Sequence, residues 1–138
     1  MIVGYTTGVF DLFHVGHVHL LQNAKSLCDK LIVGVSTDDL VGYKGKKSVI
    51  PFEERLQIVA ANKYVDLVVP QEKIDKIEAY KKFKFNVLIV GDDWYDKPTW
   101  KHYEEELAKH NVRVFYMPYT KSTSSTIINK TLLSLRGE

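Results

Sequence analysis

The alternation of short apolar runs with segments of helical character constrains the fold of this chain more than any other feature. Five runs have the length of strands, and a segment with helical periodicity or a helix-start signal follows each of them. Continuous apolar runs are typical of parallel strands that are covered on both faces. The sequence therefore predicts an α/β fold in which one domain, residues 1–138, contains a doubly wound five-stranded parallel sheet. The expected strands are 2–6, 31–36, 65–69, 87–90 and 112–117, and the expected helices are 15–28, 51–62, 73–83, 98–110 and 124–135.

The sequence also allows predictions for the segment 37–50 and for the end of the third strand. The segment 37–50 is polar and contains two glycines, so we expect a mobile loop there. Pro70 follows the third apolar run, and we expect it to end that strand because proline cannot donate to a strand ladder.

Composition narrows the class of protein. A chain of 138 residues with 45% hydrophobic and 26% charged residues can form one globular domain with a substantial core. The net charge of +2 argues against a nucleic-acid surface, and no apolar stretch reaches the length of a membrane span. The single cysteine, Cys28, excludes an intrachain disulfide and is expected to be a core thiol. We expect a cytoplasmic protein that binds neither nucleic acid nor membranes.

The chemistry-bearing segments all follow expected strands. They are residues 7–17, 37–46, 91–94 and 119–126. Because the carboxyl ends of parallel strands meet at one edge of the sheet, these segments are expected to converge around a small ligand.

The first of these segments has the composition of a phosphate site. His14 and His17 are three residues apart at the start of an expected helix, so their side chains lie on one face. Gly16 between them lets a ligand approach the backbone. The free N–H groups of a helix's first turn and the helix dipole favour an anion.

This segment, G-V-F-D-L-F-H-V-G-H, resembles the H-x-G-H signature of the nucleotidyltransferase superfamily, and its wording is similar to that of the cytidylyltransferases, in particular those that act on glycerol 3-phosphate. The resemblance implies a Rossmann-like fold in which His14 and His17 contact phosphate oxygens of a nucleoside triphosphate. It also implies that Lys44 and Lys46 are catalytic and bind phosphate; Lys47 carries less of this expectation. The expected nucleotide-binding residues are Thr7, Gly8, Val9, Phe10, Asp11, Gly16, Arg55, Gly91, Asp92, Asp93, Trp94, Ser124, Ser125 and Thr126.

Each of these assignments has an ordinary structural alternative. The lysines, which alternation would place on one side of an extended segment, could form a solvated loop. Arg55 could be a surface arginine paired with Glu53 or Glu54. Gly91-Asp92-Asp93-Trp94 could be a turn with a surface tryptophan, but the resemblance implies that it receives cytosine, which favours CTP over ATP.

The last segment departs from the family pattern. Ser124, Ser125 and Thr126 match its run of hydroxyls, which could also be plain helix capping. Tyr119 stands where the family has an arginine, and Lys121-Ser122 replaces Glu-Gly. We hypothesise that Lys121 supplies the missing charge.

Further departures concern the second substrate. Lys63 stands where relatives carry arginine, and Ile74 stands near a usual tryptophan. Asp66 fits the family pattern, but its role could instead be limited to capping a strand. The expected substrate-binding residues are Lys63, Asp66, Ile74, Tyr119 and Lys121.

The resemblance implies an enzyme that transfers a cytidylyl group from CTP, with Mg²⁺, to glycerol 3-phosphate for cell-wall or capsule precursors, and that works as a homodimer. Three alternatives stay open. The acceptor could be another phosphorylated alcohol, such as a polyol, choline or amido-alcohol phosphate. The nucleotide could be ATP, because adenylyltransferases share H-x-G-H. The chain could also bind nucleotides without catalysis. The sequence predicts no protein ligands for a metal.

Overall fold

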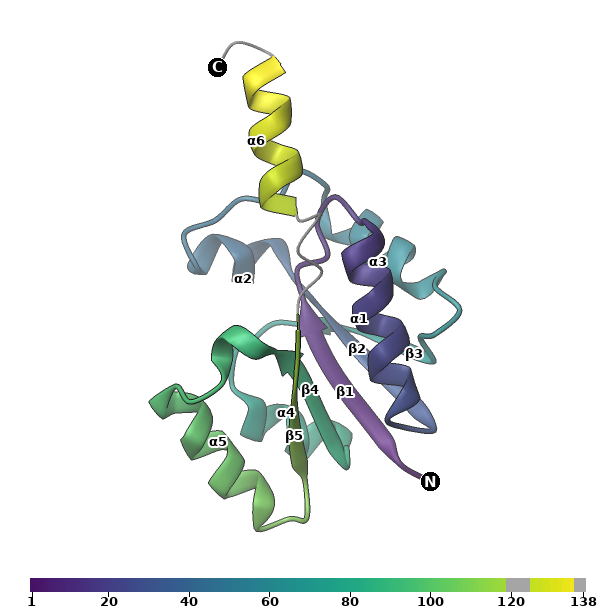
Figure 1. Ribbon diagram of the computed structural model, residues 1–138, viewed down its shortest axis with the longest axis vertical. Helices are drawn as coiled ribbons and strands as arrows, with labels where there is room; N and C mark the ends of the chain where they lie inside the picture. The colour runs from purple at the N-terminus through teal and green to yellow at the C-terminus, as the bar shows by residue number, and fades with distance from the viewer. Residues whose placement is uncertain (119–124, 136–138) are drawn as a thin grey trace.

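The computed structural model, which describes residues 1–118 and 125–135, contains a sheet of five parallel strands (Figure 1). The strands are β1 (Val3–Gly8), β2 (Lys30–Ser36), β3 (Leu67–Gln71), β4 (Val87–Gly91) and β5 (Arg113–Met117). Their order in the sheet is β3-β2-β1-β4-β5. The first half of the chain builds outward from β1 on one side and the second half on the other, which is the doubly wound arrangement that the apolar runs predict. The predicted fold class is confirmed.

Helices cover both faces of the sheet, two on each (Figure 1). Apolar side chains of α1 (Val15–Ser26) and α3 (Phe52–Ala60) pack on one face, and those of α4 (Lys76–Phe83) and α5 (Pro98–Ala108) pack on the other. Neighbouring residues of a strand point to opposite faces, so Val33 belongs to the first core and Ile32 to the second. Cys28, just beyond α1, is half-buried against the first core.

Part of the expected loop 37–50 is a helix. The helix α2 (Asp38–Tyr43) begins at Thr37, whose hydroxyl accepts the N–H of Leu40 at 3.2 Å. Two acidic residues occupy its first turn, where the helix dipole favours negative charge. Burial of Leu40 and Val41 holds this short helix against the body. Six residues with a glycine among them show too little periodicity for sequence reasoning to recognise.

The strand β3 begins two residues later than expected and continues through Pro70. Pro70 lies opposite Val35 of β2 and was wrongly expected to end the strand. The position is permitted because β3 is an edge strand, so the side on which proline lacks an N–H needs no partner.

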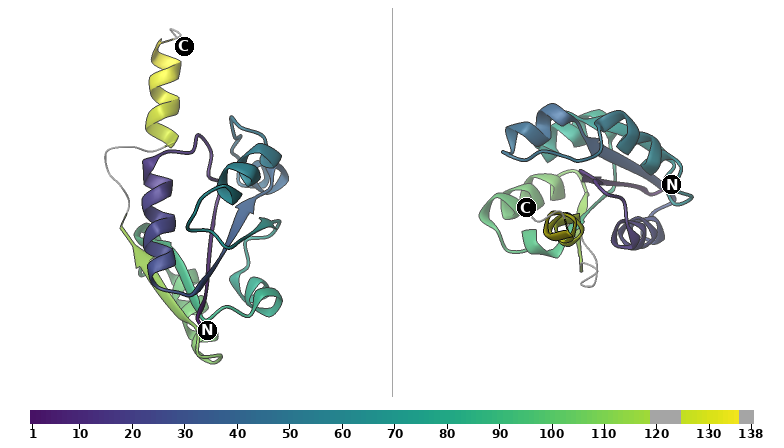
Figure 2. Two further views of the ribbon diagram at one scale, coloured as in Figure 1. Left: turned by 90° about the vertical axis from the view of Figure 1, so that its right-hand side faces the viewer. Right: turned by 90° about the horizontal axis from the view of Figure 1, so that it is seen from above.

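The switch between β1 and β4 positions the site. The chain leaves β1 to build β2 on one side, and it returns after β3 to place β4 on the other. Ligands of such sheets bind at the carboxyl ends of the strands beside this point. The helix α6 (Ser125–Leu135) extends beyond the same edge, away from the sheet (Figures 1 and 2). Within the described ranges, no helix is long and apolar enough to cross a membrane.

Candidate active site

Two histidines form the N-terminal cap of α1. His14 is the N-cap residue, and its Nδ1 accepts the N–H of Gly16 at 3.0 Å. The Nδ1 of His17 accepts the N–H of His14 at 3.1 Å, which completes a reciprocal capping box. A neutral imidazole that accepts at one nitrogen carries its proton on the other. Both rings therefore carry a proton on Nε2, the nitrogen that the cap leaves available to a ligand.

The surroundings of the two rings keep them neutral. Burial, followed by the charge of His14, lowers the pKa of His17 to about 4, against a smaller opposing effect of Asp11. Burial also lowers the pKa of His14. The rings of Phe10 and Phe13 pack on His17, with centroids 5.4 and 5.1 Å away. At neutral pH the pair is a set of uncharged hydrogen-bond donors rather than a pair of cations.

The turn between β1 and α1 is built around Phe10. Phe10 adopts a left-handed backbone with φ of 55° and is buried. Its ring crosses Gly8 so closely that a Cβ there would lie 2.9 Å from Cε2 of Phe10. A side chain at position 8 would displace the ring, so packing against Phe10 favours glycine there.

Asp11 connects this turn to the segment that carries the lysines. Its two carboxylate oxygens accept the N–H groups of Val49 at 2.7 Å and Ile50 at 2.9 Å. The sequence predicted that Asp11 binds the nucleotide. In the structure its carboxylate binds these two backbone N–H groups. It holds the chain after α2 next to the histidine turn.

Arg55 occupies the interior, not the surface. Its side chain is 0% exposed. Its guanidinium donates to the carbonyls of Val9 and Ser36 at 2.7 and 2.8 Å, and Nε donates to that of Ile50 at 2.8 Å. The remaining bond, at 2.7 Å, goes to Asp38. Four of its five N–H groups bond to the protein, which gives Arg55 a supporting role in the site, and its contact with nucleotide stays a prediction; neither Glu53 nor Glu54 is its partner.

Asp38 is a member of the site that sequence reasoning missed. Its carboxylate accepts from Arg55, from the Ser48 hydroxyl at 3.0 Å and from the N–H of Phe52 at 3.1 Å. The bonds from Phe52 and Arg55 lower its pKa. Asp38 and Arg55 together hold the ends of β1 and β2 to the start of α3.

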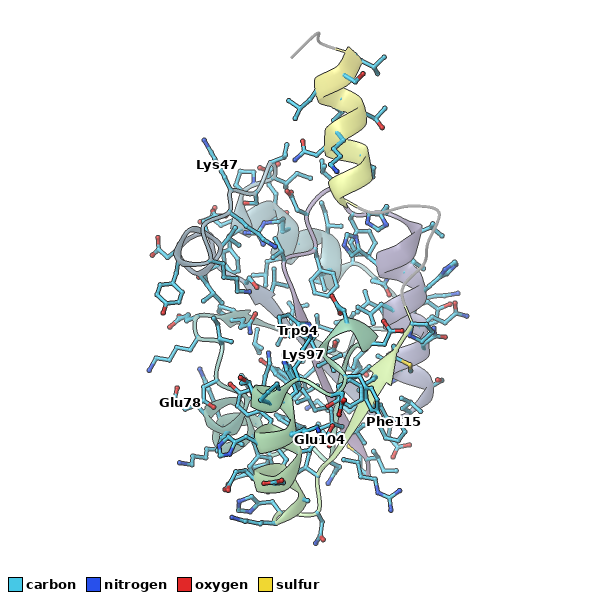
Figure 3. All side chains as sticks on the ribbon, turned by 60° about the vertical axis from the view of Figure 1, so that its left-hand side comes forward. Lys47, Glu78, Trp94, Lys97, Glu104 and Phe115 are labelled. Atoms are coloured by element: carbon cyan, nitrogen blue, oxygen red, sulfur yellow. The ribbon has the colours of Figure 1, made fainter. Side chains whose placement is uncertain are left out.

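Lys44 and Lys46 lie at the end of α2. Lys44 is its C-cap residue, so the segment is not extended as alternation suggested, and Gly45 takes a φ of 75°. Partial burial and the charge of Lys46 lower the pKa of Lys44. Figure 3 shows Lys47 on the outside of this loop, pointing away from the molecule.

Lys76 is a second residue that sequence reasoning missed. It is the first residue of α4 and is 5% exposed. Its Nζ donates to Oγ1 of Thr7, at the carboxyl end of β1, at 2.9 Å. The available signal was its spacing from Tyr80 and Phe83, which puts this lysine on the apolar face of its helix.

The segment from Gly91 to Trp94 lies at the carboxyl end of β4. Gly91 ends the strand, and Asp92–Trp94 form the 3₁₀ turn η1. Trp94, labelled in Figure 3, is 48% exposed. Its ring lies 5.9 Å from that of buried Trp100. The turn is beside the end of β1 and offers an aromatic surface and two exposed carboxylates to a ligand.

The predicted acceptor residues separate into three groups. Ile74 lines an open cavity of about 470 Å³ between α2 and the chain that precedes α4. Lys63 and Asp66 lie at the opposite, amino-terminal edge, where Asp66 accepts the N–H of Leu31 at 2.7 Å and pairs with Lys25. Asp66 fastens the start of β2, and Nζ of Lys63 lies over the ring of Tyr64, so their role in binding the acceptor stays a prediction. Tyr119, Lys121 and Ser124 lie outside the described residues, as do the side chains of Ser125 and Thr126, whose backbone begins α6.

Comparisons with known proteins agree with the motif. The chain matches the model of the cytidylyltransferase-like family over residues 5–131. It is 39% identical over 131 residues to a glycerol-3-phosphate cytidylyltransferase of Bacillus spizizenii, across 94% of this chain and 96% of that protein. It is 38% identical over 106 residues to an FAD synthase of Archaeoglobus fulgidus, across 77% of this chain and 75% of that protein. A solved lipopolysaccharide core biosynthesis protein of Thermoplasma volcanium superposes with a TM-score of 0.72 at 27% identity, across 89% of this chain and 99% of that one.

Proposed function

This chain belongs to the cytidylyltransferase-like family, and we propose that it transfers a cytidylyl group from CTP to a small phosphorylated alcohol, with glycerol 3-phosphate as the favoured acceptor. The products are a CDP-alcohol and pyrophosphate. The match to glycerol-3-phosphate cytidylyltransferase extends over nearly the whole of both chains, which supports the same reaction here.

The observation that carries the proposal is the neutral histidine pair at the start of α1. In the transfer, an oxygen of the acceptor's phosphate forms a bond to the α-phosphorus, and the bond to the β-phosphate oxygen breaks with its electron pair leaving on pyrophosphate. The attacking phosphate is already an anion, so no base has to remove a proton. What the reaction needs is hydrogen-bond donors and positive charge at the phosphate oxygens. Nε2 of His14 and His17 provides such donors.

Lys44 and Lys46 provide the charge. They follow α2 in a segment that Asp11 fastens to the histidine turn. Positioned cations stabilise the charge that spreads over the equatorial oxygens and the leaving group. We assign Ser124, Ser125 and Thr126 to the β- and γ-phosphates on the resemblance alone.

The assignment of CTP rests on residues 91–94. Their place beside the end of β1 suits a base whose ribose and phosphates lead to α1. The FAD synthase match supports ATP as the second candidate, because its product contains an adenylyl group.

Mg²⁺ is proposed as the accompanying ion. Among the described residues, no group of three His, Cys, Asp or Glu side chains could hold a metal. These residues therefore fit an ion whose ligands come mainly from the triphosphate, as is usual for Mg²⁺. When bound, the ion neutralises phosphate charge, while His14 and His17 orient the α-phosphate.

We also propose a homodimer that supplies precursors of a cell-wall or capsule polymer. Leu132, Leu133 and Leu135 of α6 are exposed and would be covered by a second copy. Light scattering of the purified protein measures its mass in solution, and a monomer at all concentrations would contradict this part.

Pyrophosphate release in a matrix of CTP and ATP against several phosphorylated alcohols tests the function. We expect turnover with CTP and glycerol 3-phosphate, its loss in His17→Asn, and wild-type turnover in the control His19→Asn, which changes an exposed histidine of the same helix. Turnover with ATP alone would replace CTP by the second candidate. Nucleotide binding without turnover on any acceptor would favour a non-catalytic protein.

A further inference from the structure

The turn η1, which we assign to the base of the nucleotide, has few contacts of its own. None of its three residues is buried, and no side chain caps its N-terminus. The N–H of Tyr95 bonds to the carbonyl of Asp92 at 3.1 Å, and the N–H of Lys97 bonds to that of Trp94 at 3.3 Å. Short exposed turns with so few bonds open easily, so the position of η1 depends on contacts with neighbouring elements.

Aromatic rings provide these contacts. The ring of Trp94 lies 5.9 Å from that of Trp100, a buried residue in the first turn of α5. Tyr95, the residue after η1, meets the ring of Tyr116 of β5 edge to face at 5.2 Å. Tyr116 also meets the ring of Trp100 edge to face, at 6.4 Å. Tyr116 is therefore in contact with the supports of both Trp94 and Tyr95.

A carboxylate of α5 fixes the ring of Tyr116. The Tyr116 hydroxyl donates a hydrogen bond to Oε1 of Glu104, which is labelled with Trp94 in Figure 3. Glu104 lies four residues after Trp100, so both are on the face of α5 that meets β5. Burial, followed by the bond to Glu104, raises the pKa of the Tyr116 hydroxyl, which therefore keeps its proton and remains the donor. Hydrogen bonds from a hydroxyl to a carboxylate are stronger than those between neutral groups.

A second link between this segment and α5 is weaker. Lys101 pairs with Asp96 at 2.9 Å, but the two side chains are 58% and 70% exposed. Exposed ion pairs contribute little, because water and salt screen them. The bond between Glu104 and Tyr116 is part-buried, so it is the contact that determines where the rings lie.

We propose that Glu104 and Tyr116 position η1 and Tyr95 for the base of the nucleotide. Glu104 orients the Tyr116 ring, and this ring contacts Tyr95 directly and Trp94 through Trp100. Tyr116 packs on the face of the sheet that α4 and α5 cover, whereas α1 with its histidines covers the other face. Both are therefore positioning residues and not catalytic ones. This inference rests on the proposed function, and it predicts an effect on nucleotide binding alone.

Steady-state kinetics of Tyr116→Phe and Glu104→Ala test the role of the bond. With the acceptor saturating, we expect each change to raise the KM for CTP about fivefold or more, while kcat and the KM for the acceptor stay within about twofold of the wild type. Because both changes break the same bond, the double variant should have the KM of the more affected single variant. The control Glu105→Ala removes an exposed glutamate of α5 and should leave all three constants unchanged.

A ligand without a base separates this role from a general effect on the site. Inorganic tripolyphosphate has phosphates but no base, so its inhibition constant against CTP should be equal in the wild type and in Tyr116→Phe. That equality would also show that the variant is folded.

Tryptophan fluorescence follows binding without turnover. The chain has two tryptophans, Trp94 and Trp100, so its tryptophan emission reports on this group of rings alone. We expect CTP to change the emission of the wild type. In Tyr116→Phe and Glu104→Ala the same change should require about fivefold more CTP.

The outcomes separate this inference from the proposed function. An unchanged KM for CTP in both variants overturns the inference, and so do additive losses in the double variant. Equal weakening of CTP and tripolyphosphate also overturns it, because Tyr116 would then act on the phosphate-binding groups or on folding. A wild-type protein that binds CTP but transfers no nucleotidyl group to any acceptor overturns the proposed function, and the fluorescence titrations then still decide whether Glu104 and Tyr116 position the turn.

Discussion

The guanidinium of Arg55 and the carboxylate of Asp38 meet at 2.7 Å with unequal exposure, since the arginine side chain is 0% exposed and the aspartate side chain 53%. The pair joins the interior of the molecule to the loop that carries the lysines. Because the arginine also serves three backbone carbonyls, the two residues contribute differently to stability.

Replacing Arg55 should cost far more than replacing its partner. Arg55→Met leaves the carbonyls of Val9, Ser36 and Ile50 without their donor, and we expect a loss of about 3–5 kcal/mol in the free energy of unfolding. Asp38→Asn removes a largely exposed, screened charge and should cost about 1 kcal/mol or less. Urea unfolding measures both. Equal losses would mean that the ion pair, not the carbonyl contacts, is the main contribution of Arg55.

Two different substitutions of His14 distinguish its role in folding from its role in catalysis. The Oδ1 atom of asparagine can replace Nδ1 as the acceptor of the Gly16 N–H, but asparagine has no equivalent of Nε2–H. We expect His14→Asn to keep wild-type stability and to lose at least about 100-fold in kcat. His14→Ala should lose the same activity and also about 1 kcal/mol of stability. An asparagine variant that keeps its activity would exclude His14 from the transfer step.

Acid should destabilise the wild type through His17. Its pKa is near 6.5 in the unfolded chain and about 4 in the folded protein, so the unfolded state binds more protons between these values. The stability that neutral His17 contributes is complete above pH 6.5 and is lost as the pH falls to 4. After allowance for partial exposure, the change is about 2 kcal/mol. Denaturant unfolding from pH 7 to 4 should show this loss relative to His17→Asn, and parallel curves would contradict it.

Alkali should have the opposite effect through Lys76. Its pKa is about 8 when folded and about 10.5 when unfolded, so between these values the unfolded state binds the extra proton and stability rises with pH. Thr7 bonds to this ammonium group, and the charges of Lys44 and Asp75 act on it; burial and the charge of Lys46 lower the pKa of Lys44. We expect the wild type to gain a few kcal/mol relative to Lys76→Met between pH 8 and 10.5. A constant difference in unfolding free energy would show that Lys76 is not strongly desolvated.

Asp11 should control the order of the lysine segment. Asp11→Ala removes the acceptor of the Val49 and Ile50 N–H groups, so residues 44–50 should open more often. We expect trypsin to cleave after Lys46 or Lys47 roughly tenfold faster than in the wild type. Asp39→Ala, a change of an exposed aspartate in α2, serves as the control. An unchanged cleavage rate would mean that other contacts hold the segment.

The sequence predicted the fold because its strongest signals are local. The strand β2 is apolar along nearly its whole length, and such a run is typical of a parallel strand covered on both faces. The helix α2 escaped notice because a single turn around Leu40 and Val41 produces no period. The strand β3 was shifted because the rule that proline ends a strand depends on whether the strand is at an edge, which is a property of the whole sheet.

The same reasoning explains which site residues could be predicted. The motif itself places His14 and His17 at the start of a helix and supplies their imidazole chemistry, so a local sequence pattern is enough to predict them. Lys76 bonds to Thr7 across 69 positions of chain, and only the packing of α4 beside β1 reveals it. Lys63 and Asp66 were assigned by their place in a family pattern, but they lie before β3, at the edge opposite the motif.

The reciprocal cap of α1 also limits how this protein can evolve. The atoms that begin the helix are in the same two rings that would contact the phosphate, so one substitution at position 14 or 17 is tested twice by selection, once for folding and once for activity. A descendant that abandoned the reaction could not drift freely at these sites. It would first need another residue able to cap α1, and a serine, aspartate or asparagine at position 14 would mark a lineage that kept the fold and gave up the chemistry.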